Sequence, residues 1–306
     1  MIQISNISKS FQGKKILNNI NLKINKGDMI GLIGPNGAGK TTFLRILTGL
    51  LKPNEGEVLI NNLNIIENRN KILKNIGFLP ENNTLYRNLT GYENLNFFAK
   101  LYGFDRPSRS RRIKELLKLF NLQKITTNVK NYSNGMKQKL AIARALINHP
   151  KILFLDEPFN NLDHQSANKL QEYLTRINVE NDITIIITTH YLLKAEKLCN
   201  RIIFINKGKI DFFGNMKELR FASNKTYQVK IILNNNKSIK IRKILQGING
   251  IEKFHLNTDM ISIYTTHPEE VNQKVIEKLV LEKIQIQEII TLKSDLETLY
   301  LNHYSL

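Results

Sequence analysis

The sequence has little that would suit a secreted, disulfide-bonded or membrane-spanning protein. Its single cysteine, Cys199, excludes an internal disulfide and fits a reducing compartment. No apolar run approaches the ~18–20 residues that a membrane helix needs, so we expect the chain not to cross a membrane by itself. Met1 leads straight into an alternating strand pattern, and we expect no signal peptide. With 306 residues, 7 prolines and 42% apolar residues, the chain is expected to form one large globular domain or two.

Acidic residues are also few relative to basic ones. The chain has 45 Lys and Arg against 26 Asp and Glu, which gives a formal net charge of +19. Residues 222–306 hold 11 basic and 9 acidic residues, so +17 of this charge lies in residues 1–221. That distribution suits a polyanionic ligand or a nearby anionic lipid surface. Because Lys, Ile and Asn are abundant throughout, we interpret the charge as biased composition and expect no nucleic-acid partner.

The first two thirds of the chain read as an α/β domain with a helical insertion. Short apolar runs predict strands at residues 2–7, 16–24, 29–33, 57–60, 76–79, 152–155 and 184–189, and a hairpin at 202–210. A helix is predicted over 42–47 and another over 136–148. From about 87 to 150, apolar residues recur at helical spacing, which indicates a helical subdomain.

A second, smaller unit is predicted after a change of texture near residues 220–225. Strands are expected at 227–233, 251–256, 261–265 and 284–290, and helices at 237–245 and 269–282. The order β-α-β-β-α-β is typical of a split βαβ fold of the α+β class. A short end helix is expected to carry Leu296, Leu299 and Tyr300. We therefore divide the chain into residues 1–220 and an accessory domain, 222–306.

A glycine-rich loop follows the predicted strand 29–33, with the sequence Gly34-Pro35-Asn36-Gly37-Ala38-Gly39-Lys40-Thr41. Glycines let successive backbone N–H groups turn inward around phosphate oxygens, at a helix N-terminus whose dipole favours anions. In such a phosphate loop Lys40 neutralises the β and γ oxygens and the Thr41 hydroxyl is a ligand of Mg²⁺. By itself the loop predicts a P-loop NTPase.

Two carboxylates, Asp156 and Glu157, end the apolar strand 152–155. Adjacent residues at a strand end point in different directions, so one can face a metal while the other faces an attacking water. We expect Asp156 to hold Mg²⁺ through water. Glu157 is expected to polarise the nucleophilic water, a role worth ~10²–10⁴ in rate.

Residues 1–220 resemble the ATP-binding subunit of ABC transporters. Tyr132-Ser133-Asn134-Gly135-Met136-Lys137-Gln138 is similar to the signature motif of that family, and Asn160-Asn161-Leu162-Asp163 is similar to its D-loop. His190 stands where the family has its switch histidine, Phe11 where it stacks an aromatic ring on adenine, and Glu81 where it has the Q-loop glutamine.

The resemblance implies a set of roles for these positions. Glu157 and His190 are the expected catalytic residues, and Thr41, Asp156 and Glu81 the expected Mg²⁺ ligands. The residues expected to bind ATP are Phe11, Gly34, Asn36, Gly37, Gly39, Lys40, Thr41, Thr42, Glu81, Ser133, Gly135 and Asp163.

Three positions depart from the family pattern: Glu81 replaces the Q-loop glutamine, Asn134 the first signature glycine, and Met136 the signature glutamine. A carboxylate at position 81 can still accept a hydrogen bond from metal-bound water, but it lacks amide donors and adds negative charge. Contacts made by the signature backbone survive these replacements, whereas contacts that need the glutamine amide do not.

The resemblance implies an ATP-hydrolysing subunit that pairs with itself or a second ABC ATPase around two MgATP. It also implies a separate transmembrane permease, contacted mainly through residues 81–100, and a peripheral position at the cytoplasmic face of the membrane. The chain is most similar to the subunits of drug, bacteriocin and polysaccharide exporters. This similarity rests on the residue sequence of the signature, the Leu-Pro-Glu Q-loop and the tail Asp295–Leu301. Two alternatives stay open: a soluble ABC ATPase acting on ribosomes or nucleic acid, and a non-catalytic partner in a heterodimer.

Overall fold

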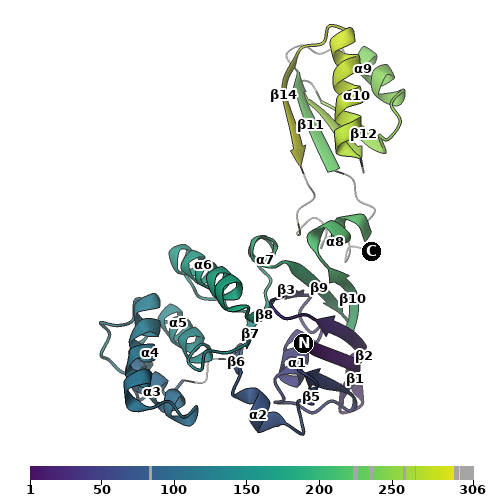
Figure 1. Ribbon diagram of the computed structural model, residues 1–306. Helices are drawn as coiled ribbons and strands as arrows, with labels where there is room; N and C mark the ends of the chain where they lie inside the picture. The colour runs from purple at the N-terminus through teal and green to yellow at the C-terminus, as the bar shows by residue number, and fades with distance from the viewer. Residues whose placement is uncertain are drawn as a thin grey trace. The chain divides into compact units, whose positions relative to one another are not determined.

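The chain forms two compact units, Met1–Asn215 and Met216–Leu306. The computed structural model describes residues 1–82, 85–222, 227–233, 238–257, 260–265, 267–292 and Leu296 (Figure 1). Each unit has its own hydrophobic core. The division falls between Asn215 and Met216, a few residues before the boundary that the sequence predicts.

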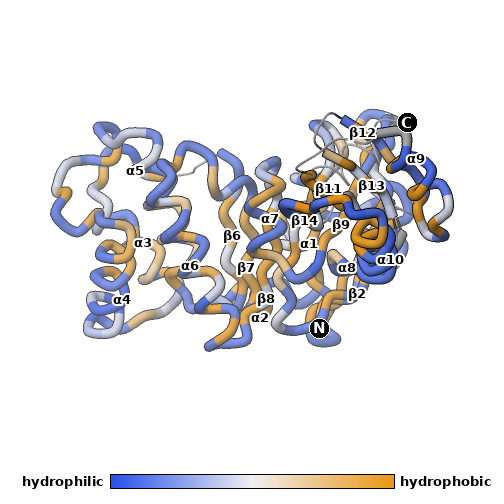
Figure 2. The backbone as a smooth tube through the Cα atoms, turned by 90° about the horizontal axis from the view of Figure 1, so that it is seen from above, coloured by the Kyte–Doolittle hydropathy of each residue, from blue (hydrophilic) through white to orange (hydrophobic). Residues whose placement is uncertain are grey.

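A six-stranded sheet organises the first unit, in the order β10-β9-β3-β8-β7-β6. Its strands are β3 (Met29–Ile33), β6 (Ile76–Leu79), β7 (Ile152–Asp156), β8 (Thr184–Thr188), β9 (Arg201–Asn206) and β10 (Lys209–Gly214). Only the edge strand β10 is antiparallel to its neighbour. Every residue of β3, β7 and β8 is buried, as expected for parallel strands covered on both faces. Figure 2 shows the hydrophobic residues running along β7 and β8.

An antiparallel sheet in the order β2-β1-β4-β5 shares a core with the parallel one. It consists of β1 (Ile2–Phe11), β2 (Lys14–Ile24), β4 (Glu55–Ile60) and β5 (Leu63–Asn64). The helix α1 (Lys40–Leu47) contributes four fully buried side chains to this shared core, namely Phe43, Leu44, Ile46 and Leu47. Packing in the core that the two sheets share holds α1 in place, and the N-terminus of α1 forms the end of the glycine-rich loop.

The remaining helices of this unit are α2 (Arg69–Leu73), α3 (Gly91–Leu101), α4 (Arg106–Leu119), α5 (Asn134–Ala145), α6 (His164–Asn181) and α7 (Leu192–Leu198), with a 3₁₀ turn at Val129–Asn131. Helices α3, α4 and α5 contact one another and occupy the range predicted for the helical subdomain. The predicted limits of α5 were wrong: the helix begins two residues before Met136 and ends three before Asn148. The strand β5 and the helices α2, α6 and α7 were not predicted.

The second unit begins with α8 (Met216–Ala222) and continues with β11 (Tyr227–Leu233), α9 (Ser238–Gln246), β12 (Lys253–Leu256), β13 (Met260–Thr265), α10 (Pro268–Leu281) and β14 (Ile286–Leu292). After α8 this is the predicted order β-α-β-β-α-β. The sheet order is β12-β13-β11-β14, with every pair antiparallel. One face of the sheet packs on α9 and α10 through residues such as Ile231, Ile263, Leu245 and Val275. The predicted end helix falls, apart from Leu296, outside the described residues.

Two further features of the described residues are the environment of the single cysteine and the lengths of the apolar helices. Cys199, at the end of α7, is buried, and burial raises the pKa of its thiol to about 12. Within the part of the chain that the structure describes, no helix is both long enough and apolar enough to span a bilayer.

Candidate active site

The glycine-rich loop runs from the end of β3 to the first residue of α1, Lys40. Gly39 has φ 107°, which L side chains rarely adopt. At Gly34 the constraint is space rather than conformation, because a Cβ there would lie 2.1 Å from the carbonyl oxygen of Ile205 on β9. Both positions therefore require glycine for the loop to lie against the sheet as it does.

Lys40 is held over this loop by its own backbone. Its Nζ donates to the carbonyl oxygens of Gly34, at 2.7 Å, and Pro35, at 3.1 Å. Burial lowers the pKa of the ammonium, while Glu157, Asp156 and Glu81 oppose that shift. A partly desolvated cation thus faces three carboxylates across an opening that a polyanion could enter.

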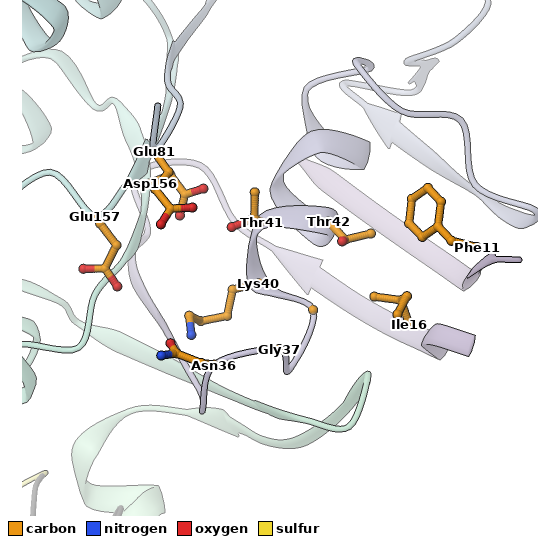
Figure 3. A pocket seen from close by; sticks show the side chains of 11 residues that line it. Phe11, Ile16, Asn36, Gly37, Lys40, Thr41, Thr42, Glu81, Asp156 and Glu157 are labelled. Atoms are coloured by element: carbon orange, nitrogen blue, oxygen red, sulfur yellow. The ribbon is translucent and has the colours of Figure 1, made fainter. Parts of the chain in front are cut away.

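That opening is a pocket of about 460 Å³, lined by Phe11, Ile16, Asn36, Gly37, Gly39, Lys40, Thr41, Thr42, Glu81, Asp156 and Glu157. Figure 3 shows Phe11 and Ile16 at one end, Thr41, Thr42 and Lys40 in the middle, and the three carboxylates at the other end. The pocket is therefore graded from apolar to cationic to anionic. An aromatic base, a phosphate chain and a metal ion would find matching surroundings in that order.

Asp156, the last residue of β7, is only 3% exposed. Its Oδ1 accepts a hydrogen bond of 2.5 Å from the Thr188 hydroxyl on the neighbouring strand β8. Its Oδ2 is buried and has no hydrogen-bond partner among the residues that the structure describes. A buried carboxylate oxygen without a partner is rare in proteins, and one that faces a phosphate-binding loop fits a metal ion or its water ligand.

Glu157 has a left-handed backbone, with φ 49°, which costs on the order of 1–3 kcal/mol in a residue other than glycine. Its N–H donates to both the carbonyl oxygen of Thr188, at 3.2 Å, and the Thr188 hydroxyl, at 2.9 Å. Burial raises the pKa of its carboxyl, and the neighbouring His190 and Lys40 oppose the shift. The carboxylate is consequently a stronger base than an exposed glutamate.

His190 follows β8 and reaches Glu157 from outside the pocket. Its Nδ1 lies 2.9 Å from Oε2 of Glu157, and its ring lies tilted against the ring of Tyr191, with 4.1 Å between centroids. The side chain is 61% exposed. The histidine therefore orients the Glu157 carboxylate while more than half of its own side chain stays open to solvent.

The predicted signature and D-loop residues lie elsewhere on the chain and do not line the pocket. Ser133 caps α5, where its hydroxyl accepts from the N–H of Met136 at 3.2 Å. Asp163 caps α6 in the same way, accepting from the N–H of Ser166 at 2.8 Å, and the hydrogen bonds from Ser166 lower the pKa of its carboxyl. Of the other predicted site residues, Gly34 and His190 also do not line the pocket, although His190 contacts Glu157, which does. One chain thus carries two separate parts of a nucleotide site.

Three residues with direct roles in this geometry were absent from the predicted set: Ile16, Thr188 and Gln138. Ile16 lines the pocket beside Phe11, and Thr188 bonds to both carboxylate residues. Gln138 is buried on α5 and donates to the backbone that follows β7. The sequence did offer a signal for Thr188, which lies at the end of the predicted strand 184–189, just before His190. Parallel neighbouring strands end at the same edge of a sheet, so Thr188 could have been expected beside the end of the strand that carries Asp156.

Comparison with protein-family models matches residues 17–160 to a family described as "ABC transporter". Two relatives from Bacillus subtilis (strain 168) align along nearly the whole chain. "Uncharacterized ABC transporter ATP-binding protein YhcH" is 33% identical over 98% of this chain and 95% of its own length. "Linearmycin resistance ATP-binding protein LnrL" is 30% identical over 99% of this chain and 97% of its own length.

A solved structure provides the corresponding comparison of folds. It is titled "Dimeric structure of a post-hydrolysis state of the ATP-binding cassette MJ0796 bound to ADP and Pi". It is 30% identical, with a TM-score of 0.67, and the match covers 71% of this chain and 99% of that one. The likeness therefore includes a complete cassette.

Proposed function

The chain belongs to the ATP-binding proteins of ABC transporters and is an ATPase, and on this premise we propose that it works as a pair around two MgATP, driving a separate membrane subunit in export. One observation carries the pairing: the phosphate-loop pocket and the signature residues are both present, yet Ser133 and Gly135 do not line that pocket. A complete site then requires the signature of a second chain, either another copy or a close relative.

Within each pocket, ATP lies along the gradient of side chains. Adenine stacks on Phe11, a contact worth ~1–3 kcal/mol per base, and the neighbouring Ile16 extends the apolar floor. The loop from Gly34 through Asn36, Gly37 and Gly39 wraps the phosphates with its N–H groups. Thr42 lies beside Thr41 at the N-terminus of α1. Lys40 exchanges its two backbone carbonyls for phosphate oxygens.

Thr41, Asp156 and Glu81 would hold Mg²⁺, and the unpartnered Oδ2 of Asp156 supports this assignment. When bound, the ion neutralises charge on the β and γ phosphates. Glu81 brings a carboxylate where the family has an amide, so this chain offers two negative side chains to the metal. Because Glu81 also faces Lys40, its charge is balanced in part by the protein.

Hydrolysis rests on Glu157, whose ionised carboxylate accepts the proton of the attacking water. A positioned general base contributes ~10²–10⁴ in rate, and the raised pKa of Glu157 makes this proton transfer more favourable. His190 holds Oε2 in place, and Thr188 holds the backbone N–H. The base is thereby fixed from both sides before a water molecule arrives.

The signature of the second chain closes the site over the γ-phosphate. Ser133 caps α5, so the positive end of that helix dipole points at the anion from the other chain. Asp163 caps α6 close by, and its Oδ2 lies 3.4 Å from Lys139. Since residues 1–221 of each copy carry +17, two such surfaces repel until ATP bridges them. Hydrolysis removes the bridge, and the pair opens.

A groove beside the helical subdomain offers a place for the membrane subunit. This groove of about 450 Å³ is lined by Arg45, Thr48, Leu50, Leu73, Ile76, Phe78, Pro80, Phe98, Tyr102, Arg144 and Ala145. Phe98 lies in the segment 81–100, which the sequence predicts to contact the permease. The largely apolar lining and the exposed Arg45 suit an amphipathic segment that carries an acidic residue. If that segment belongs to the membrane subunit, the chain would lie at the cytoplasmic face of the membrane. Export is supported by the resistance-type name of LnrL.

Nucleotide binding and size measurements test the proposal. Purified protein should bind MgATP, Lys40→Ala should abolish that binding, and the exposed-lysine control Lys52→Ala should retain it. Glu157→Gln should accumulate as an ATP-bound dimer in size-exclusion chromatography with light scattering. If Glu157→Gln stays monomeric with saturating ATP, the paired site is wrong. Copurification of a membrane protein with the tagged chain tests the permease.

A further inference from the structure

Residues 157–163, between β7 and α6, are tied to the first turns of α5 at three points. The Gln138 side chain donates from Nε2 to the carbonyl oxygens of Glu157, at 3.3 Å, and Pro158, at 3.2 Å. Lys139 Nζ lies 3.4 Å from Asp163 Oδ2. A Cβ at Gly135 would come within 2.8 Å of the Asn161 carbonyl oxygen, so the two backbones touch there. Helix α5 and this loop are therefore connected by direct contacts at both ends of the loop.

Gln138 is the buried member of these contacts, at 4% exposed, and it acts on a strained backbone. Glu157 has φ 49°. Such a conformation persists only where the surroundings over-determine it. Thr188 fixes the N–H of Glu157, and Gln138 fixes its carbonyl oxygen. The two bonds leave the Glu157 side chain directed into the pocket, as Figure 3 shows.

The two ends of this connection serve different nucleotides in the proposed pair. The N-terminus of α5 carries Ser133 and Gly135, which would face the ATP held by the second chain. Glu157 faces the ATP held by its own chain. Gln138 lies one turn along α5 from Gly135 and contacts the backbone of Glu157.

We propose that Gln138 is a positioning residue, which orients Glu157 toward the nucleotide bound by its own chain. The orientation of Glu157 would then depend on the position of the signature helix, α5, of the same chain. The inference rests on the proposed pairing around two ATP. When α5 of one chain docks on the nucleotide of the second chain, the Gln138 side chain would hold Glu157 in place at the first chain's own nucleotide. Gln138 itself would touch neither nucleotide. A merely structural glutamine would instead affect folding and nucleotide binding together.

Gln138→Met keeps the length of the side chain and removes both donors. We expect kcat to fall on the order of 10²-fold, as for a misplaced catalytic group, while ATP affinity stays within about 2-fold of the wild type. The matched control is Gln171→Met on α6, which has no part in the site. Turnover near the wild-type value for Gln138→Met, or a loss of ATP affinity parallel to the loss of turnover, would overturn the assignment.

Mixed pairs separate the positioning role from a folding defect. In a mixed pair isolated by two different tags, one chain carries Glu157→Gln and the other keeps Glu157, so hydrolysis is confined to one composite site while both signature helices keep Ser133. Gln138→Met is then introduced into either chain. We expect the greater loss of turnover when it lies in the chain with the intact Glu157. Equal losses, or a greater loss from the other chain, would refute the assignment.

The same assays distinguish failure of this inference from failure of the proposed function. If the wild-type chain neither binds nor hydrolyses MgATP, the proposed function itself is wrong. If the wild type turns over ATP as a pair and Gln138→Met does so equally fast, the pairing stands and the role of Gln138 is refuted. Melting temperatures of all variants, measured without nucleotide, show whether each chain is folded.

Discussion

Thr188→Val is a sharp test of how the carboxylates of the site are held. The Thr188 hydroxyl donates to Asp156 Oδ1 at 2.5 Å and accepts from the N–H of Glu157 at 2.9 Å. Valine has nearly the same shape and suits a β-strand well, so the substitution removes the oxygen without opening a cavity. Any effect then reports on these two hydrogen bonds.

The expected magnitude follows from the partners that remain. A buried hydrogen bond to a charged carboxylate is worth about 1.5–3 kcal/mol, and its loss leaves Asp156 with a second unpaired oxygen. In Thr188→Val the N–H of Glu157 loses its hydrogen bond to the hydroxyl but can still donate to the carbonyl oxygen of residue 188, at 3.2 Å. The loss of this second hydrogen bond therefore costs at most about 1 kcal/mol. We therefore expect a destabilisation of about 2–4 kcal/mol, which lowers Tm by roughly 4–16 °C for a unit of this size. Turnover should fall on the order of 10²-fold, because both carboxylates lose a support.

Thermal unfolding without nucleotide and steady-state ATPase assays measure the two effects. Thr188→Ser is the control, since it retains the hydroxyl and loses only a methyl group, and most of the turnover should return. If Thr188→Val unfolds at the wild-type temperature and hydrolyses ATP at the wild-type rate, then the hydroxyl does not support Asp156 and Glu157.

Further predictions concern the charges and the loop of the pocket. Glu81→Gln should change turnover more than ATP affinity in parallel binding and ATPase assays; a large affinity change would place Glu81 in ground-state binding. His190→Ala should move the acid limb of residual kcat to higher pH, because loss of His190 leaves the pKa of Glu157 raised further and Glu157 acts only when ionised; a limb that stays in place contradicts this. Gly34→Ala should weaken MgATP binding at least about 10-fold, since its Cβ would meet a β9 carbonyl 2.1 Å away. Gly247→Ala is the control, because its backbone does not have a positive φ and the nearest atom to a Cβ there lies 3.6 Å away; it should leave MgATP binding unchanged, and equal effects of the two substitutions would refute the steric argument.

The parts of the site that lie close together in sequence were the most predictable. The glycine-rich loop between a strand and a helix, and the carboxylates after β7, follow from local patterns, and the structure brings Lys40, Thr41, Asp156 and Glu157 into one pocket. The alternation of short strands with helical segments indicated the α/β class, and the element order of the second unit was also readable.

Contacts between distant segments were less accessible. Thr188 was missed because its role depends on β8 lying beside β7, which no local pattern specifies. Gln138 was missed because its partners stand 19 and 20 residues further along the chain. The N-terminus of α5 was placed too late because the cap by Ser133 lets Asn134 enter the helix. Its C-terminus was placed too late because Asn148 turns to donate to the carbonyls of Lys74 and Ile76.

The buried thiol at the end of α7 gives this chain a practical advantage. With a pKa of about 12, Cys199 stays protonated at neutral pH and is shielded from maleimide dyes. A cysteine introduced at a solvent-facing site, such as Val179 on α6, would be the one reactive sulfur in the polypeptide. Fluorescence energy transfer between two such labels could therefore follow the association and separation of protomers in real time, with the native cysteine left in place.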